Sequence, residues 1–325
     1  MSQMSEAIDI RGLHTYFFTP RGVCKSVRGV DLTIRSGEIV GLVGESGSGK
    51  SVTAHSIMRL IPSIGRIVEG QISFDGIDLA TAGEREVRRI RGNRIAMIFQ
   101  EPMTSLNPVL RVGRQVAEVL LLHRSLSRAE ALERVVELFA LVGISDPSSR
   151  VHAYPHEMSG GMRQRVMIAM ALACDPALII ADEPTTALDV TIQAQVLGLL
   201  SDLVRNSGSS LLLITHDLGV VSETADRVAV MYAGQIVETA PVESFFDKPL
   251  HPYSIGLMNC VPKMGHALSD RMLPTMSGSV PDLSALPEGC AFQSRCPHVH
   301  DRCRNEEPSL LNVDDNHQVR CWLHV

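Results

Sequence analysis

The sequence predicts an α/β fold with a mostly parallel core sheet, an antiparallel β subdomain, an inserted helical subdomain and a small Cys-rich C-terminal extension. Apolar runs of strand length, such as PALIIADE and SLLLITHD, each lead into a helical stretch, which is typical of a parallel sheet with crossover helices. From about residue 103 to 172 the pattern is helical. After about residue 245 clear periodicity fades, and nine of the 17 prolines fall from position 241 onward, which indicates a second, smaller domain.

The single elements can be followed along the chain. Short strand-like runs occupy residues 8 to 45 and end with EIVGLVGE, after which SVTAHSIMRLI has the pattern of a helix. QISFDGIDL alternates apolar and polar residues around Asp75-Gly76, as a β-hairpin does, and RIAMIFQ is typical of a buried strand. In ALERVVELFALVGI the apolar residues recur at helical spacing, and Ser127 with Glu130 predicts a capping box at the helix start.

The bulk composition is that of an ordinary globular protein. Its 325 residues can bury a substantial core, and a net charge of -6 gives the surface no general attraction for nucleic acid. No apolar run approaches the ~18 residues that cross a bilayer, and the N-terminal MSQMSEAIDIRG is too polar for a secretory signal. We therefore expect a soluble, cytosolic chain, unless a partner holds it at a membrane.

The phosphate loop, GESGSGKS at Gly44–Ser51, fits the pattern G-x-x-x-x-G-K-[ST] and has a predicted strand before it and a predicted helix after it. Its glycines let the backbone curl so that N–H groups face phosphate oxygens, Lys50 can reach the β- and γ-phosphates, and Ser51 can ligate Mg²⁺. A glycine-rich turn that matches by chance is the alternative. We predict that the nucleotide contacts Gly44, Ser46, Gly47, Ser48, Gly49, Lys50, Ser51 and Val52.

Two carboxylates end the apolar run LIIADE. Asp182 suits the Mg²⁺ shell, directly or through water, as in other P-loop nucleotidases. Glu183 is placed to accept a proton from an attacking water. A strand that ends in solvated acids is the alternative, but the phosphate loop earlier in the chain favours the catalytic interpretation.

A second glycine-rich stretch, EMSGGMRQR at residues 157–165, contains the serine–glycine segment Ser159–Gly161. This segment lies directly before an apolar stretch that has the pattern of a helix. Backbone N–H groups at the positive N-terminal end of a helix bind anions. Because the segment has no lysine, it resembles half of a phosphate site. A simple N-capped helix is the alternative.

With MSGGMRQR, ADEPTTALD and THD following the phosphate loop in this order, residues 8 to about 245 resemble the ATPase subunits of ABC transporters. The resemblance implies a P-loop ABC ATPase fold, with ATP and Mg²⁺ as ligands. It also implies that the serine–glycine segment binds the γ-phosphate of an ATP held by a second ATPase subunit. Met162 departs from the family, in which Gln is usual at this position, whereas the serine and both glycines are present.

The same resemblance implies roles for single residues. Gln100 matches the glutamine that contacts Mg²⁺ and water and senses the membrane partner, Asp189 matches the inter-subunit aspartate, and His216 matches the histidine that contacts the γ-phosphate. Phe17 is the candidate for the aromatic ring that stacks on adenine, with Tyr16 as the fallback and a plain core aromatic as the alternative. The implied catalytic residues are Glu183, His216, Gln100 and Lys50. The implied cofactor-binding residues outside the phosphate loop are Phe17, Ser159, Gly160, Gly161 and Asp189, and the implied Mg²⁺ ligands are Ser51, Gln100 and Asp182.

Four cysteines of the tail, Cys290, Cys296, Cys303 and Cys321, have the spacing C-x5-C-x6-C-x17-C. Zinc sites usually contain a tight C-x2-4-C pair, and the wider spacing suits an iron–sulfur cluster at least as well. Zinc, with His298, His300 or His317 as a further ligand, and unligated cysteines are the alternatives. The other three cysteines are expected to be plain buried residues: Cys24, Cys174 and Cys260.

Together with HPYSIGLMNCVP at residues 251–262, this tail resembles the peptide/nickel branch of ABC importers, whose C-terminal extension carries the same cysteine pattern. We favour a structural [4Fe–4S] cluster on the four cysteines. The expected domains are an ABC nucleotide-binding domain over residues 1–245, with its helical subdomain at about 103–172, and a C-terminal extension over residues 246–325.

The activity implied by this branch is ATP hydrolysis that powers import of di- or oligopeptides, or of a related solute such as nickel. The implied partners are a paralogous ATPase subunit, two integral membrane permease subunits and an extracytoplasmic solute-binding protein, with the chain peripheral at the cytoplasmic face of the inner membrane. A soluble ABC ATPase of DNA repair or translation is the rival, but such proteins generally carry two cassettes or a long coiled-coil insertion. A metal-sensing or redox-regulatory protein is a third interpretation.

Overall fold

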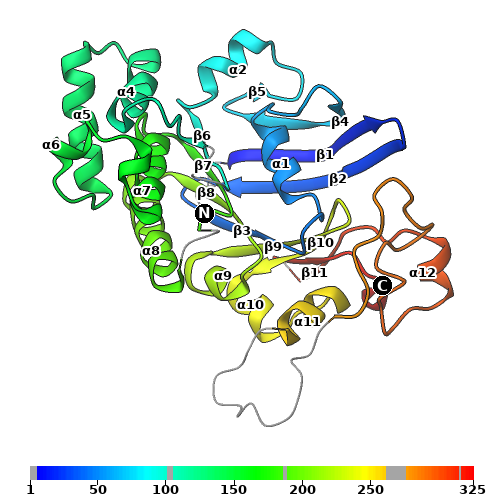
Figure 1. The fold of residues 1–325 in the computed structure, drawn as a ribbon. Helices are drawn as coiled ribbons and strands as arrows, with labels where there is room; N and C mark the ends of the chain where they lie inside the picture. The colour runs from blue at the N-terminus through cyan, green and yellow to red at the C-terminus, as the bar shows by residue number, and fades with distance from the viewer. Residues whose placement is uncertain (1–5, 101–104, 186–188, 261–275, 315) are drawn as a thin grey trace, which may run out of the picture. The chain divides into compact units, whose positions relative to one another are not determined.

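The structure is a computed structural model that describes residues 6–100, 105–185, 189–260, 276–314 and 316–325 (Figure 1). The chain forms two compact units. The first comprises Met1–Ile8, Thr33–Ile39 and Ser73–Ile214, and the second comprises Asp9–Leu32, Val40–Ile72 and Thr215–Val325. Each unit is therefore assembled from segments that are far apart in the sequence.

Parallel strands form the centre of the first unit. Strands β6 (Ile95–Ile98), β7 (Leu178–Asp182) and β8 (Ser210–Thr215) lie in that order, with Ile95 opposite Leu178 and Leu178 opposite Ser210. Nearly every residue of these strands is buried, as expected for parallel strands that are covered on both faces. Because α8 (Val190–Ser207) connects β7 to β8, the predicted arrangement of parallel strands with crossover helices is confirmed here.

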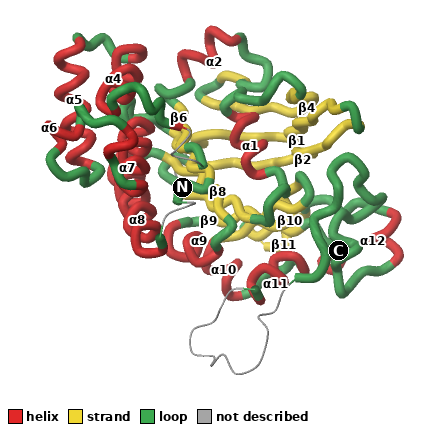
Figure 2. Tube along the Cα trace, viewed as in Figure 1, coloured by secondary structure: helices red, strands yellow, loops and turns green. Residues whose placement is uncertain are grey.

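Among the described residues, four helices lie between β6 and β7 in the chain, drawn in red in Figure 2. They are α4 (Val112–His123), α5 (Arg128–Leu141), α6 (Pro147–Arg150) and α7 (Gly160–Leu172), with the short 3-10 turn η1 (Pro155–Glu157) before α7. The predicted capping box is confirmed, because Ser127 and Glu130 each accept a hydrogen bond from the other's backbone amide. Residues 103 and 104, where the expected helical subdomain begins, and 186–188 of ADEPTTALD lie outside the described residues.

The predicted hairpin joins β4 (Gly65–Phe74) to β5 (Ile77–Asp78), with Phe74 opposite Ile77 in antiparallel register. Asp75 (φ 48°) and Gly76 (φ 79°) both take the left-handed conformation that a two-residue type I′ turn needs. The expectation of a hairpin at Asp75-Gly76 is therefore confirmed. Helix α2 (Glu84–Ile90) follows it.

The second unit contains a β-hairpin and a mixed sheet segment. Strands β1 (Glu6–Thr19) and β2 (Gly22–Arg35) are hydrogen-bonded neighbours joined by two residues, as in an antiparallel hairpin. In the mixed segment, β3 (Ile39–Val43) pairs in parallel with β9 (Arg227–Tyr232). Strands β10 (Gln235–Pro241), β12 (His317–Val319) and β11 (Leu311–Asp314) follow β9 in antiparallel order. The tail therefore adds two strands to this segment.

Residues of the tail also share the core of the second unit. Phe292 and Ala291 are buried in one cluster with Tyr232, Tyr253 and Phe245. The helices that the structure describes in this unit are α1 (Lys50–Ile57), α9 (Leu218–Thr224), α10 (Val242–Asp247), α11 (Pro252–Asn259) and α12 (Asp301–Asn305). The 3-10 turn η2 (Trp322–His324) follows near the C-terminal end. The domain boundary at residue 245 stays a prediction, and the residues on both sides of it pack on the same core.

In the part of the chain that the structure describes, no helix is both long and apolar enough to cross a membrane. Cys174 is buried, as expected, whereas Cys24 and Cys260 are half-exposed. The expectation of burial is therefore wrong for these two cysteines. Cys24 lies close to the tip of the β1–β2 hairpin, and Cys260 is the C-cap of α11.

Candidate active site

The phosphate loop connects β3 to α1 in the second unit, and its backbone requires glycine at two positions. Gly44 (φ 152°) and Gly49 (φ 109°) take conformations that other residues rarely adopt. A Cβ on Gly44 would lie 2.2 Å from the carbonyl oxygen of Met231, and a Cβ on Gly49 would lie 2.4 Å from that of Ser26. Gly47 (φ 81°) differs, since no atom lies within 4 Å of its would-be Cβ. Neighbouring strands thus hold the loop tightly curled.

Lys50 lies inside this curl. Its ammonium donates hydrogen bonds to the carbonyl oxygens of Gly44 (2.7 Å) and Glu45 (3.1 Å), and its side chain is buried. The Ser48 hydroxyl is also buried and has no hydrogen-bond partner among the described residues. A buried hydroxyl beside a buried ammonium, in a curl lined by backbone amides, fits the charge and hydrogen-bonding needs of a polyphosphate. The other predicted loop contacts are half-buried or exposed: Ser46, Gly47, Ser51 and Val52.

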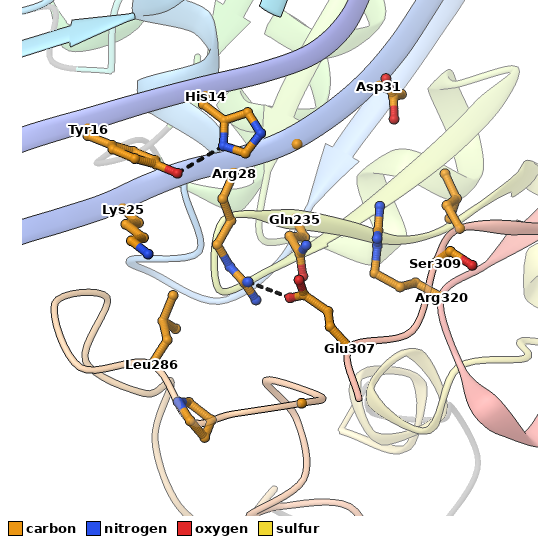
Figure 3. Close-up of a pocket in the computed structure, with 14 residues that line it drawn as sticks. His14, Tyr16, Lys25, Arg28, Asp31, Gln235, Leu286, Glu307, Ser309 and Arg320 are labelled. Atoms are coloured by element: carbon orange, nitrogen blue, oxygen red, sulfur yellow. Dashed lines mark hydrogen bonds and ion pairs between the residues drawn. The ribbon is translucent and has the colours of Figure 1, made fainter. Parts of the chain in front are cut away.

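The two aromatic candidates for adenine stacking point to opposite faces of β1, because successive side chains of a strand alternate. The ring of Phe17 lies against Ile61 and Gly65, where a Cβ on the glycine would come within 2.7 Å of the ring. Tyr16 lies instead in a separate cavity of about 700 Å³, where its hydroxyl is 3.0 Å from His14 Nδ1 (Figure 3). Burial raises the pKa of Tyr16. Residues of β1, β2 and the tail line this cavity, so Tyr16 contributes to a different surface from that of Phe17.

In the first unit, the ends of β6 and β7 bring two predicted site residues together. Because parallel strands end at the same edge of a sheet, Gln100 and Glu183 come close, and Gln100 Nε2 donates to Glu183 Oε2 at 2.9 Å. Glu183 has the left-handed φ of 46°, and its amide donates to the carbonyl oxygen of Ile214. Such a backbone conformation costs about 1–2 kcal/mol in a non-glycine residue and is frequent at functional sites. Asp182, the preceding residue, is buried.

The serine–glycine segment begins helix α7 of the first unit. Ser159 is the N-cap, and its hydroxyl oxygen accepts from the amide of Met162 at 3.3 Å. The interaction uses the backbone of Met162, so the unusual side chain at this position does not alter it. Gly160 is exposed, and a Cβ on Gly161 would lie 2.9 Å from Cγ2 of Ile192 in α8. The first-turn amides of a helix have no acceptor within the helix, so this segment offers donors at its surface.

Asp189 and His216 each stand beside the start of a helix. Asp189 is the exposed N-cap of α8, and its carboxylate accepts from the Ile192 amide at 2.9 Å. His216 is exposed after β8 in the second unit, and the next residue, Asp217, caps α9 by accepting from the Gly219 amide at 2.8 Å.

The predicted site residues are divided between the two units. The first unit holds Gln100, Asp182, Glu183, Ser159, Gly160, Gly161 and Asp189, and the second holds Phe17, the phosphate loop and His216. Within the units, the structure joins Gln100 to Glu183 and Lys50 to the loop backbone. The roles of these residues stay predictions.

Three residues near the phosphate loop did not follow from the sequence. Glu45, the second residue of the loop, forms an ion pair with Arg295 of the tail, and its amide donates to the hydroxyl of Tyr253. An acidic residue inside a loop expected to bind phosphates is a signal that a counter-charge is needed. The sequence gives no indication, however, of which arginine supplies it.

The four tail cysteines lie in one region of the second unit. Cys303 and Cys321 are buried, Cys290 and Cys296 are half-buried, and the amide of Cys290 donates to the carbonyl oxygen of Cys303 at 2.8 Å. Burial raises the pKa of Cys290 to about 11. Among the described residues, however, no group of three or more His, Cys, Asp or Glu side chains is arranged to hold a metal ion. The iron–sulfur cluster therefore stays a prediction.

His317, one of the three candidate histidines for a zinc site, has another partner in the structure. His317 Nε2 lies 2.8 Å from a carboxylate oxygen of Glu238, and both side chains are buried. Glu238 also accepts hydrogen bonds from the amides of Leu250 and His251. His317 is therefore engaged in joining β12 to β10, whereas His298 and His300 are exposed.

Comparisons with known proteins agree with this geometry. The family described as "ABC transporter" matches residues 27–186, and the family described as "Oligopeptide/dipeptide transporter, C-terminal region" matches residues 237–303. A solved structure titled as the dimeric post-hydrolysis state of an ATP-binding cassette bound to ADP and Pi is similar with a TM-score of 0.65 and 28% identity, over 72% of this chain and 98% of that one.

Relatives of known name match almost the whole chain. The oligopeptide transport ATP-binding protein AppD of Bacillus subtilis is 52% identical over 99% of this chain and 98% of its own length. A protein of Sinorhizobium fredii named as a peptide ABC transporter ATP-binding protein, with the qualifier "probable", is 54% identical over 97% of this chain and 94% of its own length. The chain therefore belongs to the ATP-binding subunits of ABC transporters, in the oligopeptide/dipeptide branch.

Proposed function

We propose that this chain hydrolyses ATP and that the hydrolysis powers import of di- or oligopeptides through a membrane transporter. The observation that carries the proposal is the phosphate loop, in which Gly44 and Gly49 have no room for a side chain and whose curl encloses Lys50. The full-length relatives named for peptide transport support the choice of solute. They do not favour the rival reading, a soluble ATPase of DNA repair or translation.

Each part of the site has a task in hydrolysis. Lys50 and the amides of the phosphate loop bind the β- and γ-phosphates, and Phe17 stacks on adenine. Glu183 takes a proton from the water that attacks the γ-phosphorus, and Gln100, which donates to Glu183, orients that water. His216 donates to the γ-phosphate.

Magnesium would be held by Ser51, Gln100 and Asp182, which offer the oxygen ligands that this ion prefers. When bound, the ion neutralises negative charge on the phosphate oxygens. The buried position of Asp182 at the end of β7 fits a ligand whose negative charge is balanced by a cation.

The serine–glycine segment serves the ATP of a neighbouring ATPase subunit, with Asp189 between the subunits. Its support is the exposed helix start with donors and no lysine. We propose a paralogous chain as that neighbour. Two permease subunits and an extracytoplasmic solute-binding protein complete the importer, which places this chain at the cytoplasmic face of the inner membrane.

A [4Fe–4S] cluster on Cys290, Cys296, Cys303 and Cys321 braces the tail in this proposal, and zinc is the alternative. Its support is the spacing of the four cysteines in the sequence, together with the burial of Cys303 and Cys321. Thiolate ligands need the metal's positive charge to offset the cost of burial. Iron and acid-labile sulfide analysis after anaerobic purification tests the cluster: stoichiometric zinc without sulfide contradicts it.

The function is tested by uptake of labelled di- and oligopeptides in a strain that lacks this gene, complemented with the wild type or with Glu183→Gln. We expect uptake with the wild type only. Uptake of nickel but of neither peptide would contradict the choice of solute, and full uptake with Glu183→Gln would contradict the hydrolytic role.

A further inference from the structure

The phosphate loop carries a negative side chain where it is expected to bind a polyanion. Glu45 is the second residue of the loop, and its carbonyl oxygen accepts from the Lys50 ammonium. A carboxylate within several ångströms of the phosphates raises the energy of the bound state unless a cation neutralises it. The structure supplies that cation from the tail.

Arg295 pairs with Glu45 through two parallel hydrogen bonds. Arg295 Nη1 lies 2.6 Å from Glu45 Oε2, and Nη2 lies 2.9 Å from Oε1. The Arg295 side chain is 3% exposed and that of Glu45 is 32% exposed. A two-pronged pair of this kind fixes direction as well as charge. It differs from the exposed ion pairs of the surface, which contribute little.

Arg295 is itself held in place. Its Nε donates to the carbonyl oxygen of Ser277 at 2.9 Å, and its guanidinium lies 5.8 Å from the centre of the Tyr232 ring and 5.9 Å from that of Phe292. An arginine guanidinium does not lose its proton in proteins, so Arg295 carries its positive charge beside Glu45. Arg295 is thus held against the core of the second unit as well as against the phosphate loop.

The backbone of Glu45 is held from the same side. Its amide donates to the Tyr253 hydroxyl at 2.8 Å, and Tyr253 is completely buried against Tyr232 and Phe292. Burial raises the pKa of Tyr253, so the hydroxyl stays protonated and accepts this hydrogen bond. Side chain, amide and carbonyl oxygen of Glu45 are therefore all fixed, and with them the direction in which the following amides of the loop point.

We propose that Arg295 is a positioning residue for ATP binding, which acts through Glu45 and does not touch the nucleotide. Arg295 cancels the charge of Glu45 and holds the phosphate loop curled, so that the loop is ready for the phosphates before they arrive. The tail thus contributes directly to the affinity of the site. This inference rests on the proposed ATPase function and adds to it a residue that no motif of the loop contains.

The test measures the steady-state KM and kcat for ATP in the assembled, purified transporter, for the wild type, Arg295→Met, Glu45→Gln and the double variant. Removing Arg295 leaves an unpaired carboxylate beside the phosphates, so we expect Arg295→Met to raise KM about tenfold, with kcat changed by less than about threefold. Glu45→Gln removes that charge. The double variant should therefore have a KM within about threefold of that of Glu45→Gln alone.

Arg302→Met is the matched control, because Arg302 belongs to the same tail and pairs with Glu306 in an exposed ion pair. It should leave KM unchanged. If Arg295→Met does not fold, Arg295→Lys retains the charge with fewer hydrogen bonds, and it should raise KM about threefold.

The outcomes separate the two proposals. A wild type that turns over ATP, together with an Arg295→Met variant of unchanged KM, would overturn the role of Arg295 alone. So would a raised KM that Glu45→Gln fails to relieve, because packing without charge compensation would then explain the defect. An unchanged KM in Arg295→Lys would count equally against it. A wild-type transporter without ATP turnover would overturn the proposed function itself and this inference with it.

Discussion

The phosphate loop and the serine–glycine segment are both short, glycine-containing stretches at the start of a helix, yet their glycines differ in conformation and surroundings. In the phosphate loop, Gly44 and Gly49 have positive φ angles and almost touch backbone carbonyl oxygens of other strands. In the serine–glycine segment, Gly160 and Gly161 belong to α7, and the close neighbour of Gly161 is the tip of the Ile192 side chain.

This difference indicates what each segment needs glycine for. The fold itself requires glycine at positions 44 and 49 of the phosphate loop, because a Cβ at either position would collide with backbone of a neighbouring strand. Helical backbone accepts most residues, so α7 would form without Gly160. Glycine in this second place is useful chiefly if something approaches the helix start closely, as the phosphate of a neighbouring subunit would. The following predictions test this contrast, from the largest expected effect to the smallest.

The largest effect is expected at the residue that both segments would serve. Glu183→Gln keeps the hydrogen-bonding shape beside Gln100 but cannot take a proton, so ATP turnover should fall by a factor on the order of 10²–10⁴, with ATP binding retained. Phosphate release by the assembled transporter and equilibrium ATP binding measure the two quantities. Glu133→Gln, an exposed glutamate of α5, is the control. Normal ATP turnover in Glu183→Gln would show that Glu183 is not the general base.

The second prediction compares the two kinds of glycine directly. Gly49→Ala should destabilise the protein by about 3 kcal/mol, because a left-handed backbone conformation and a collision with the Ser26 carbonyl oxygen act together. Gly160→Ala should change the free energy of unfolding by less than about 1 kcal/mol. Urea denaturation of the purified chains checks both values. Equal losses would show that the two segments use glycine in the same way.

The third prediction concerns how the stability of the fold depends on pH through His251, which caps the helix that carries Tyr253. His251 caps α11 by accepting from the Tyr253 amide, and burial, aided by the charge of His324, lowers the pKa of His251 from 6.5 to about 3. The unfolded chain therefore binds a proton at pH 5 that the folded chain excludes. Neutral His251 therefore contributes fully to the free energy of unfolding above pH 6.5, and this contribution is lost as the pH falls from 6.5 towards 3. At pH 5 the loss is about 2 kcal/mol.

The measurement is the free energy of unfolding at pH 7 and pH 5 for the wild type and for His251→Asn, which retains an acceptor but does not titrate. The wild type should lose about 2 kcal/mol more than the variant between the two pH values. Exposed His152 provides the control variant His152→Asn, which should behave like the wild type. The prediction fails if the wild type and His251→Asn lose the same amount.

The smallest effect separates capping from phosphate binding. Ser159 and Ser127 are both N-caps of the first unit, and each accepts from an amide three residues later at 3.3 Å. Ser159→Ala and Ser127→Ala should therefore each cost about 1 kcal/mol of stability. Only Ser159→Ala should also lower ATP turnover in the assembled transporter, by about tenfold, because it removes a donor to the transferred phosphate. Equal losses of ATP turnover in both variants would show that Ser159 acts only as a helix N-cap.

Much of the local structure was predictable because its cause lies within a few residues. Asp75-Gly76 defines a tight turn, Ser127 and Glu130 define a helix start, and the apolar runs define buried parallel strands. The neighbouring positions of Gln100 and Glu183 were also predictable, since both residues follow strands of a parallel sheet, although their 2.9 Å hydrogen bond was not.

The tail was predicted less well, because its structure depends on contacts across long stretches of chain. Its periodicity is weak, so the sequence did not show that Phe292 completes the core beneath Tyr232 and Tyr253. Nor did the sequence show that Glu238 forms a hydrogen bond with His317, which was a candidate zinc ligand. Cysteine spacing suggested a cluster, but spacing alone does not specify how side chains are oriented.

The sequence by itself determined the chemistry of the phosphate loop and the order of the motifs, because glycine, lysine and serine act there through local backbone geometry. Only the tertiary structure decided that the negative charge of Glu45 is cancelled by Arg295, a residue 250 positions away. The physical reason is that backbone sterics act over a few bonds, whereas an ion pair depends on which segments the whole core packs together.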